Sequence, residues 1–274
     1  MADAFITFLS DYGLTDEYVG VCHGVMAAIC PQARIIDLTH GIARHDVRAG
    51  ALVLRNALAF VPAGVHLAVV DPTVGASGEH GRRAVAVRAA EPGRVLVGPD
   101  NGLLMPALQQ LGGAVEAVDV GRSPRRLEPV SATFHGRDIF APVAAALAAG
   151  EPLAALGDPL PVGELRELAL PAAVLENGEL RAHVVAADHF GNLILDAGHT
   201  ELGALGARLG STVELHLGGR VERARYAVTF ADVAPGELLL YEDAQRMAAL
   251  AVNRGSAAEV LGLQRDGELL LALP

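Results

Sequence analysis

Apolar and polar positions form alternating blocks along the first half of the chain. Short apolar runs such as residues 5–9 (Phe-Ile-Thr-Phe-Leu) stop at polar residues, which is typical of buried strands. Longer stretches between them carry apolar residues three and four positions apart, and this spacing predicts helices; an example is the set Val21, Cys22, Val25, Met26 and Ile29. The expected strands are 5–9, 33–38, 66–70, 84–88 and 95–97, and the expected helices are 17–29 (capped by Thr15 or Asp16), 49–60, 103–111 and 140–149.

Strands that alternate with helices predict an α/β domain with a mainly parallel sheet flanked by helices. In such sheets, ligands bind beyond the carboxyl ends of the strands. Acidic residues fall at these ends in the expected elements, and they are Asp11, Asp37, Asp71 and Asp100. This coincidence is the first indication of where a functional site lies.

The pattern changes after about residue 150. Prolines punctuate residues 150–180, which we expect to form a linker. Beyond residue 180 the apolar runs are short, alternating and separated by glycine turns, a pattern typical of a smaller antiparallel β-barrel-like domain. The expected strands are 182–187, 192–195, 212–217, 223–228, 237–241 and 268–273, with one helix at 245–252. The sequence therefore predicts domains at residues 1–165 and 180–274.

Charge and composition narrow the function classes. A formal net charge of −11 disfavours nucleic acid as a general partner, because phosphate repels an acidic chain. Cys22 and Cys30 are eight positions apart, near the two ends of one expected helix, so we expect two core residues and neither a disulfide nor a metal site. No apolar run is long enough to span a bilayer, and the first residues do not resemble a secretory signal, so we expect a cytoplasmic protein with no membrane partner.

Four clusters of residues could carry chemistry: 10–16, 71–75 followed by Arg82-Arg83, 133–138 and 188–192. A carboxylate such as Asp11 can accept hydrogen bonds from a ribose diol, and Asp16 is placed to hold an ammonium group. His135 has a side chain suited to proton transfer near neutral pH. Each cluster also has a structural interpretation, as a turn, a helix cap, a hairpin tip or a bulge, and a lone histidine is more often structural than catalytic.

The order of these clusters is more specific than any one of them. It resembles the S-adenosylmethionine hydroxide adenosyltransferase family, whose relatives include the fluorinase and chlorinase that make 5′-halogenated deoxyadenosine. The matching stretches are residues 10–16, 37–51, 70–75, 98–104, 133–142, 188–192 and 253–263, so the resemblance covers nearly the whole chain.

The resemblance implies hydrolysis of S-adenosylmethionine to adenosine and methionine, with neither a metal nor a redox cofactor. It places Asp71, Arg82 and His135 near the reacting carbon, a set that the halogenases lack. It also implies a homotrimer, with each site between the first domain of one subunit and the second domain of a neighbour. The substrate-binding residues implied are Asp11 on the ribose, Asp16 on the ammonium, Thr133 and Phe134 near the sugar, and Asp188, Phe190 and Asn192 near the methionine and adenine.

Two departures from the family pattern keep details open. Ala244 stands where relatives often have a serine, and the segment 76–81 is longer than usual, so Arg83 is an alternative to Arg82. Three other functions remain as alternatives: a halogenase on the same scaffold, a metal-dependent nucleotide phosphatase, and a non-catalytic adenosine or S-adenosylmethionine binding module. Tyr12 directly after Asp11 argues against the phosphatase, which needs adjacent carboxylates on a hard cation.

Overall fold

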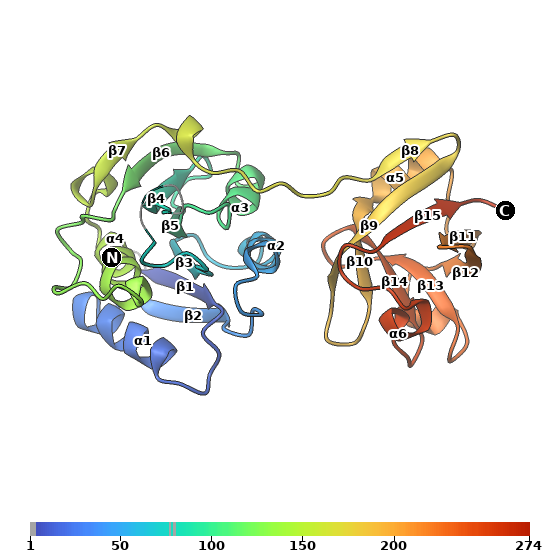
Figure 1. The fold of residues 1–274 in the computed structure, drawn as a ribbon, viewed down its shortest axis with the longest axis horizontal. Coiled ribbons are helices and arrows are strands. Elements are labelled where there is room, and N and C mark those ends of the chain that lie inside the picture. The colour runs from blue at the N-terminus through green and yellow to red at the C-terminus, as the bar shows by residue number, and fades with distance from the viewer. Residues whose placement is uncertain (1–3, 77, 79–80) are drawn as a thin grey trace. The chain divides into compact units, whose positions relative to one another are not determined.

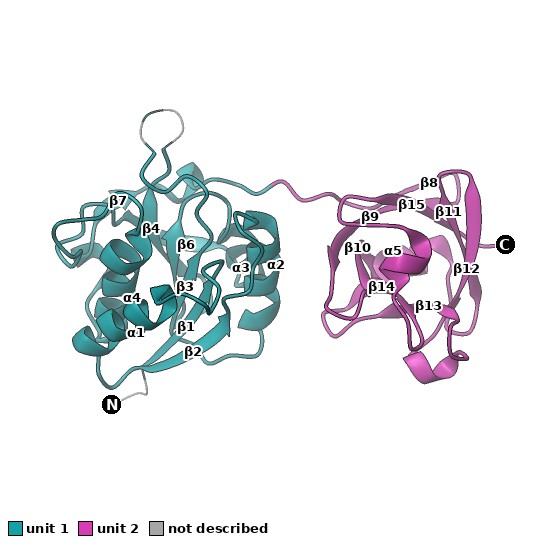
Figure 2. Cartoon of the chain, turned by 60° about the horizontal axis from the view of Figure 1, so that its bottom comes forward, with its two compact units in different colours: residues 1–168 teal, residues 169–274 magenta. Residues whose placement is uncertain are grey.

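The computed structural model describes residues 4–76, 78 and 81–274. The chain forms two compact units, residues 1–168 and residues 169–274, shown in teal and magenta in Figure 2. Figure 1 shows helices and strands alternating in the first unit and strands predominating in the second. None of the helices in the described part of the chain is long and apolar enough to cross a membrane.

The first unit is a three-layer α/β domain. Its sheet has the strand order β2-β1-β3-β5-β4-β6-β7, in which β2, β1, β3 and β5 are parallel and the last three strands are antiparallel to their neighbours. The elements are β1 (Phe5–Ser10), α1 (Tyr18–Ile29), β2 (Arg34–Thr39), α2 (Val47–Leu58), β3 (Val65–Val69), β4 (Ala84–Ala89), β5 (Val95–Pro99), α3 (Met105–Gln110), β6 (Ala114–Asp119), a π-helical turn (Gly136–Phe140), α4 (Ala141–Ala148) and β7 (Asp158–Leu160), with short 3₁₀ turns at Leu153–Ala155 and Val162–Glu164.

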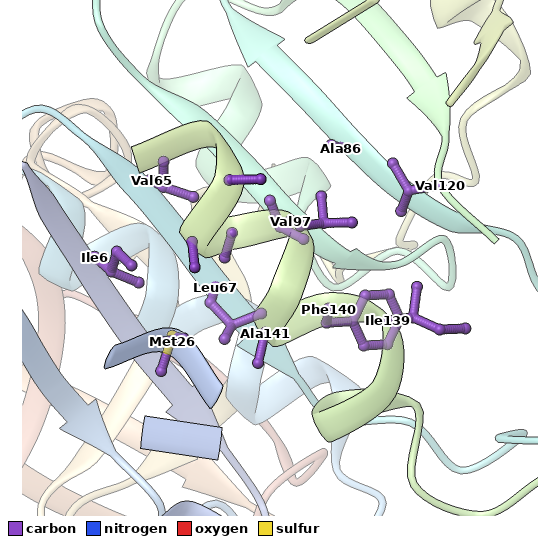
Figure 3. Close-up of a cluster of buried hydrophobic side chains, with 14 of the residues drawn as sticks. Ile6, Met26, Val65, Leu67, Ala86, Val97, Val120, Ile139, Phe140 and Ala141 are labelled. Carbon is purple, nitrogen blue, oxygen red and sulfur yellow. The ribbon is translucent and has the colours of Figure 1, made fainter. Parts of the chain in front are cut away.

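Both faces of this sheet are covered by helices. Successive side chains of a strand point to opposite faces, so Ile6 and Phe8 join the core under α1 and α4, and Leu9 joins the core under α2 and α3. Figure 3 shows part of the first core, where Met26 of α1 and Phe140 lie against apolar side chains of the strands. Because helices cover both faces of the sheet, nearly every residue of the central strands β1, β3, β5 and β4 is buried, and these strands are nearly continuous apolar runs in the sequence.

The strand order places a crevice at one point of the sheet. The connection from β1 leads to β2 on one side, and the connection from β2 returns to β3 on the other side of β1. The helices α1 and α2 therefore leave in opposite directions, and the carboxyl ends of β1 and β3 lie beside the gap between them. Such a switch point is where open α/β sheets bind ligands.

The second unit is a closed barrel of seven strands. The ring runs β9-β10-β14-β13-β12-β11-β15 and closes because β9 pairs with both β15 and β10. All neighbouring pairs are antiparallel except β12 with β13. The elements are β8 (Val174–Glu176), β9 (Glu179–Ala187), β10 (Leu193–Gly198), α5 (His199–Leu205), β11 (Thr212–Leu217), β12 (Arg220–Tyr226), a 3₁₀ turn (Phe230–Asp232), β13 (Leu238–Glu242), β14 (Met247–Val252), α6 (Ala257–Leu261) and β15 (Glu268–Ala272).

Two local predictions from the sequence are wrong. The helix expected at 245–252 is strand β14, because that apolar run lies between β10 and β13 and uses its backbone groups for both neighbours. Helix α1 is preceded by Glu17 without a side-chain cap, rather than by Thr15 or Asp16. Cys22 and Cys30 are buried and free, as predicted.

Candidate active site

The predicted clusters of the first unit meet at the switch point. Asp11 follows β1 directly, and Asp71 comes two residues after the end of β3. Arg82 comes two residues before β4, which runs antiparallel to β5, so the start of β4 lies at the same edge as the ends of the parallel strands. The topology thus brings Asp11 to the same edge of the sheet as Asp71 and Arg82, which are 60 and 71 positions further along the chain.

Asp71 and Arg82 form a buried ion pair. The Nε of Arg82 donates to both carboxylate oxygens of Asp71, at 3.1 and 3.0 Å, and its terminal nitrogen also contacts Oδ2. The side chains are only 4% and 6% exposed. The guanidinium carbon also lies 5.2 Å from the centre of the Phe140 ring. These contacts fix the carboxylate in an environment where water screens charge poorly.

His135 completes this set through its ring nitrogen Nδ1. A terminal nitrogen of Arg82 lies 3.0 Å from Nδ1, and because a guanidinium can only donate, Nδ1 must be the acceptor. Burial and the Arg82 charge lower the pKa of His135, while Asp71 and Asp138 act weakly in the other direction. The imidazole is therefore neutral near pH 7, with its proton on Nε2.

The π-helical turn that carries His135 into α4 leaves room for a tyrosine. A Cβ added at Gly136 would lie 2.0 Å from the hydroxyl oxygen of Tyr12, so only glycine fits there. Burial raises the pKa of Tyr12 well above its ordinary value, and its hydroxyl stays protonated. Sequence reasoning missed Tyr12 as a site residue, and the one available signal was its place directly after Asp11.

The remaining predicted residues of the first unit are less buried. Oδ2 of Asp11 accepts a hydrogen bond of 2.9 Å from the backbone N–H of His45, which holds the carboxylate at the strand end. Phe134 packs edge-on against Tyr12 and Tyr18, with ring centres 5.8 and 5.1 Å apart. Asp16 and Thr133 are exposed. The rings of Phe134, Tyr12 and Tyr18 therefore pack together near the end of β1, which Asp11 follows.

Arg83 has different partners from Arg82. Its terminal nitrogen binds Glu164 at 2.9 Å, and the other lies 3.8 Å from Asp100. The structure therefore brings Arg82, and not Arg83, together with Asp71 and His135. Of the preceding segment, residues 77, 79 and 80 lie outside the described residues.

A cleft of about 1030 Å³ borders Arg82 and His135. Neither Asp71 nor Asp11 lines it, so it approaches the set from the Arg82 and His135 side. Its wall also carries Arg122, Arg166 and several carboxylates, which make it polar. The cleft gives water a route to the ion pair.

The predicted residues of the second unit form one turn between β9 and β10. The carboxylate of Asp188 accepts from the backbone N–H groups of Phe190 and Asn192, both at 2.9 Å, and from the Asn192 amide at 2.7 Å. Asn192 is buried, whereas Phe190 is 75% exposed. Asp188 thus orders this turn and leaves an aromatic face open.

An α/β domain with a switch-point site, followed by a closed barrel, defines the architectural class. The model of the SAM hydroxide adenosyltransferase N-terminal domain matches residues 6–157, and that of the C-terminal domain matches residues 182–269. The chain belongs to the SAM hydroxide adenosyltransferase family.

Relatives of known name and structure agree with this assignment. A protein of Salinispora tropica named (R)-S-adenosyl-L-methionine hydrolase is 47% identical over 261 residues, which cover 94% of each chain. A fluorinase of Actinopolyspora mzabensis is 30% identical and covers 94% of this chain and 95% of its own. The crystal structure of an uncharacterized conserved protein from Thermotoga maritima superposes with a TM-score of 0.90 at 36% identity, over 97% of this chain and 99% of that one.

Proposed function

We propose that this enzyme hydrolyses S-adenosyl-L-methionine to adenosine and L-methionine by attack of water on the ribose 5′ carbon. In this reaction a carbon–oxygen bond forms, the carbon–sulfur bond breaks, and sulfur keeps the electron pair as a neutral thioether. The water gives up one proton. The observation that carries the proposal is the buried set of Asp71, Arg82 and His135 beside a water-accessible cleft.

The hydrogen bonds divide the roles within this set. Nδ1 of His135 accepts from Arg82, and Nε2 carries the ring proton, so a neutral His135 in this arrangement is a donor. The carboxylate of Asp71 is the remaining acceptor, and we assign it the water proton. Arg82 holds that carboxylate in place, and the Nε2–H of His135 orients a polar partner.

Positioning is the main demand of this chemistry. A sulfonium is already a good leaving group, so no acid has to protonate it. The difficulty is to hold a poor nucleophile in line with the carbon, and fixed geometry supplies most of that gain. We therefore propose that turnover needs neither a metal nor a redox cofactor.

The charge of Asp71 argues against the halogenase alternative. A buried carboxylate 6% exposed repels a halide ion from the position where the nucleophile must stand. The greater identity to the relative named as a hydrolase than to the fluorinase supports the same choice. The site has a specific obstacle to halide attack.

Substrate binding is proposed on the predicted residues of both units. Asp11 holds the ribose hydroxyls, Asp16 the ammonium group, and Thr133 and Phe134 line the sugar pocket. Asp188, Phe190 and Asn192 contact the methionine and adenine from a neighbouring subunit of a homotrimer. The trimer and a cytoplasmic location stay predictions from the sequence.

Product analysis tests the proposal directly. Purified protein is incubated with S-adenosyl-L-methionine in heavy-oxygen water, with chelator, in matched buffers with and without chloride or fluoride. We expect adenosine carrying the label in its 5′ hydroxyl, with methionine in equal amount and no halide dependence. A halogenated nucleoside would instead establish the halogenase.

A binding measurement distinguishes the hydrolase from the remaining alternative, a non-catalytic binding module. If no product forms while calorimetry shows tight binding of S-adenosyl-L-methionine or adenosine, the protein is a non-catalytic binding module. If neither turnover nor binding occurs, the proposed substrate is wrong.

A further inference from the structure

Two histidines and an aspartate converge outside the proposed reaction set. His23 on α1, Asp37 on β2 and His40 just after β2 each offer one ligand atom, and these atoms lie within 4.8 Å of one another. In the part of the chain that the structure describes, no other group of three such residues comes this close. The set ties α1 to the edge of the sheet, where Figure 1 shows α1 beside β2.

The two distances from Asp37 to the histidines match those between neighbouring metal ligands. Oδ1 of Asp37 lies 2.9 Å from Nε2 of His23 and 3.1 Å from Nε2 of His40. Metal–ligand bonds of about 2.0–2.2 Å place adjacent ligands at roughly 3 Å from each other. A cation can therefore be held with only small side-chain movements.

His40 supplies a second, independent observation. Its side chain is only 2% exposed, and its Nε2 makes no hydrogen bond, although Oδ1 of Asp37 lies 3.1 Å away. Buried polar atoms without partners are rare in folded proteins and call for an explanation. A cation between Nε2 and the carboxylate would satisfy both groups.

The orientation of His40 is fixed from its other nitrogen. Nδ1 lies 2.7 Å from the hydroxyl oxygen of Ser10, which is fully buried at the end of β1. A hydrogen bond on one ring nitrogen selects the tautomer and points the other nitrogen at the ligand, as in most histidine metal sites. The Phe8 ring, 4.7 Å from the His40 ring, restricts rotation further.

We propose that His23, Asp37 and His40 bind one divalent transition-metal ion, with Zn²⁺ as the best-matched common candidate. Two imidazoles exclude a preference for magnesium or calcium, which take oxygen ligands. Asp37 is 40% exposed and His23 is 33% exposed, so the remaining coordination position faces solvent and takes water. The ion would brace α1 against the sheet, and no step of the proposed hydrolysis passes through it.

Cobalt(II) and zinc(II) titrations of the metal-free chain test the site. We expect one ion per chain, visible ligand-field absorption with cobalt, and a rise in melting temperature of roughly 5–10 °C at a hundredfold excess over the dissociation constant. His23→Ala and Asp37→Asn should weaken binding at least tenfold while the metal-free protein stays folded. Ser10→Ala should weaken it by about 10- to 100-fold.

A matched control comes from the second unit. His183 lies 2.7 Å from the Asp196 carboxylate but is not part of a three-ligand group, so His183→Ala should leave metal binding unchanged. The proposal is overturned if no ion binds at one equivalent, or if binding survives His23→Ala and Asp37→Asn. Because binding is read without substrate, neither result depends on the hydrolase assay.

Discussion

The two units differ in what they bury. Among the described residues, eight polar or charged residues are buried over their whole surface, backbone included, in the first unit, and one, Asn192, in the second. The eight are Thr7, Ser10, His40, His66, Arg94, Asp100, Ser123 and Asp138. The side chains that pack inside the barrel are mostly apolar.

The difference in buried polar residues corresponds to a difference in what each unit has to do. An apolar barrel gains its shape from burial and strand closure, which tolerate few polar groups. The α/β unit holds networks in which each buried polar atom needs a partner, such as His66 between Thr7 and Arg94 at 2.9 and 3.1 Å. Such networks fix side chains in one arrangement, and this is what a site built on positioning requires.

The largest expected effect is at the buried ion pair. Asp71→Asn removes the proposed proton acceptor, and turnover should fall by about 10²- to 10⁴-fold. It also leaves Arg82 buried without a counter-charge, which should reduce the free energy of unfolding by about 3–5 kcal/mol. Steady-state kinetics and denaturant unfolding measure the two effects.

A buried carboxylate of the barrel is the control for that variant. Asp196 is 3% exposed and lies 2.7 Å from His183. Asp196→Asn should lower stability and leave turnover within about twofold of the parent, since general acid–base effects are confined to groups in reach of the reacting atoms. Equal losses of turnover in both variants would show that the comparison reflects stability alone.

A cavity made in the core of one unit should destabilise mainly that unit. Leu250 is fully buried in β14, opposite Leu193 of β10 and Leu240 of β13. Leu250→Ala should cost about 2–5 kcal/mol of unfolding free energy. Hydrogen exchange should speed up in the barrel strands and stay unchanged in β1 and β3.

The reverse variant completes this test. Leu96 in β5 is equally buried, and Leu96→Ala should speed exchange in the α/β sheet only. If either variant speeds hydrogen exchange equally in both units, the units unfold as one cooperative block. Their stabilities would then not be independent.

Acid should destabilise the first unit through His66. Burial and the Arg94 charge lower the pKa of His66 from 6.5 to about 3. Below pH 6.5 the unfolded chain takes up a proton that the folded unit does not, so stability falls as the pH drops from 6.5 toward 3. The loss is about 1.4 kcal/mol per pH unit, or about 3 kcal/mol at pH 4.

Unfolding of the parent and of His66→Gln at pH 7, 5 and 4 measures this contribution. The variant should be less stable at pH 7 but should lose less between pH 7 and pH 4. The prediction is contradicted if both proteins show the same dependence on pH.

Replacing His135 should reduce turnover by about 10²-fold, with binding less affected, because the group acts on the reacting water. His135→Gln should retain more activity than His135→Ala, since an amide N–H can replace the Nε2–H donor. The lowered pKa of His135 means that protonation disturbs the parent only below pH 6.5. A parent rate that falls as pH drops through 6.5 would indicate an ordinary, solvated histidine.

Strand ends and their acidic residues could be predicted from the sequence, because short apolar runs alternate there with amphipathic helices and stop at polar residues. Asp11 and Asp71 were placed this way. The apolar run at 247–252 could not be assigned, because a buried strand and a buried helix look alike without knowledge of the neighbours.

Side-chain contacts between residues on different elements could not be predicted from the spacing of apolar positions either. Arg82 and Arg83 are neighbours just before β4, yet Arg82 binds Asp71 and Arg83 binds Glu164. The position of Tyr12 against Gly136 spans more than 120 residues. Periodicity describes one element at a time, so side-chain packing between elements has to come from the structure.

The smallest expected effect concerns binding at the edge of β1. Asp11→Ala removes a charged acceptor for the ribose hydroxyls, worth about 1.5–3 kcal/mol, so adenosine and S-adenosyl-L-methionine should both bind roughly 10- to 100-fold more weakly. Asp16→Ala should weaken the substrate but not adenosine, because adenosine lacks the ammonium group. Calorimetry with both ligands distinguishes the two residues. If adenosine binds Asp11→Ala as tightly as the parent, the ribose lies elsewhere, and the Asp11 carboxylate serves only to hold the backbone of His45.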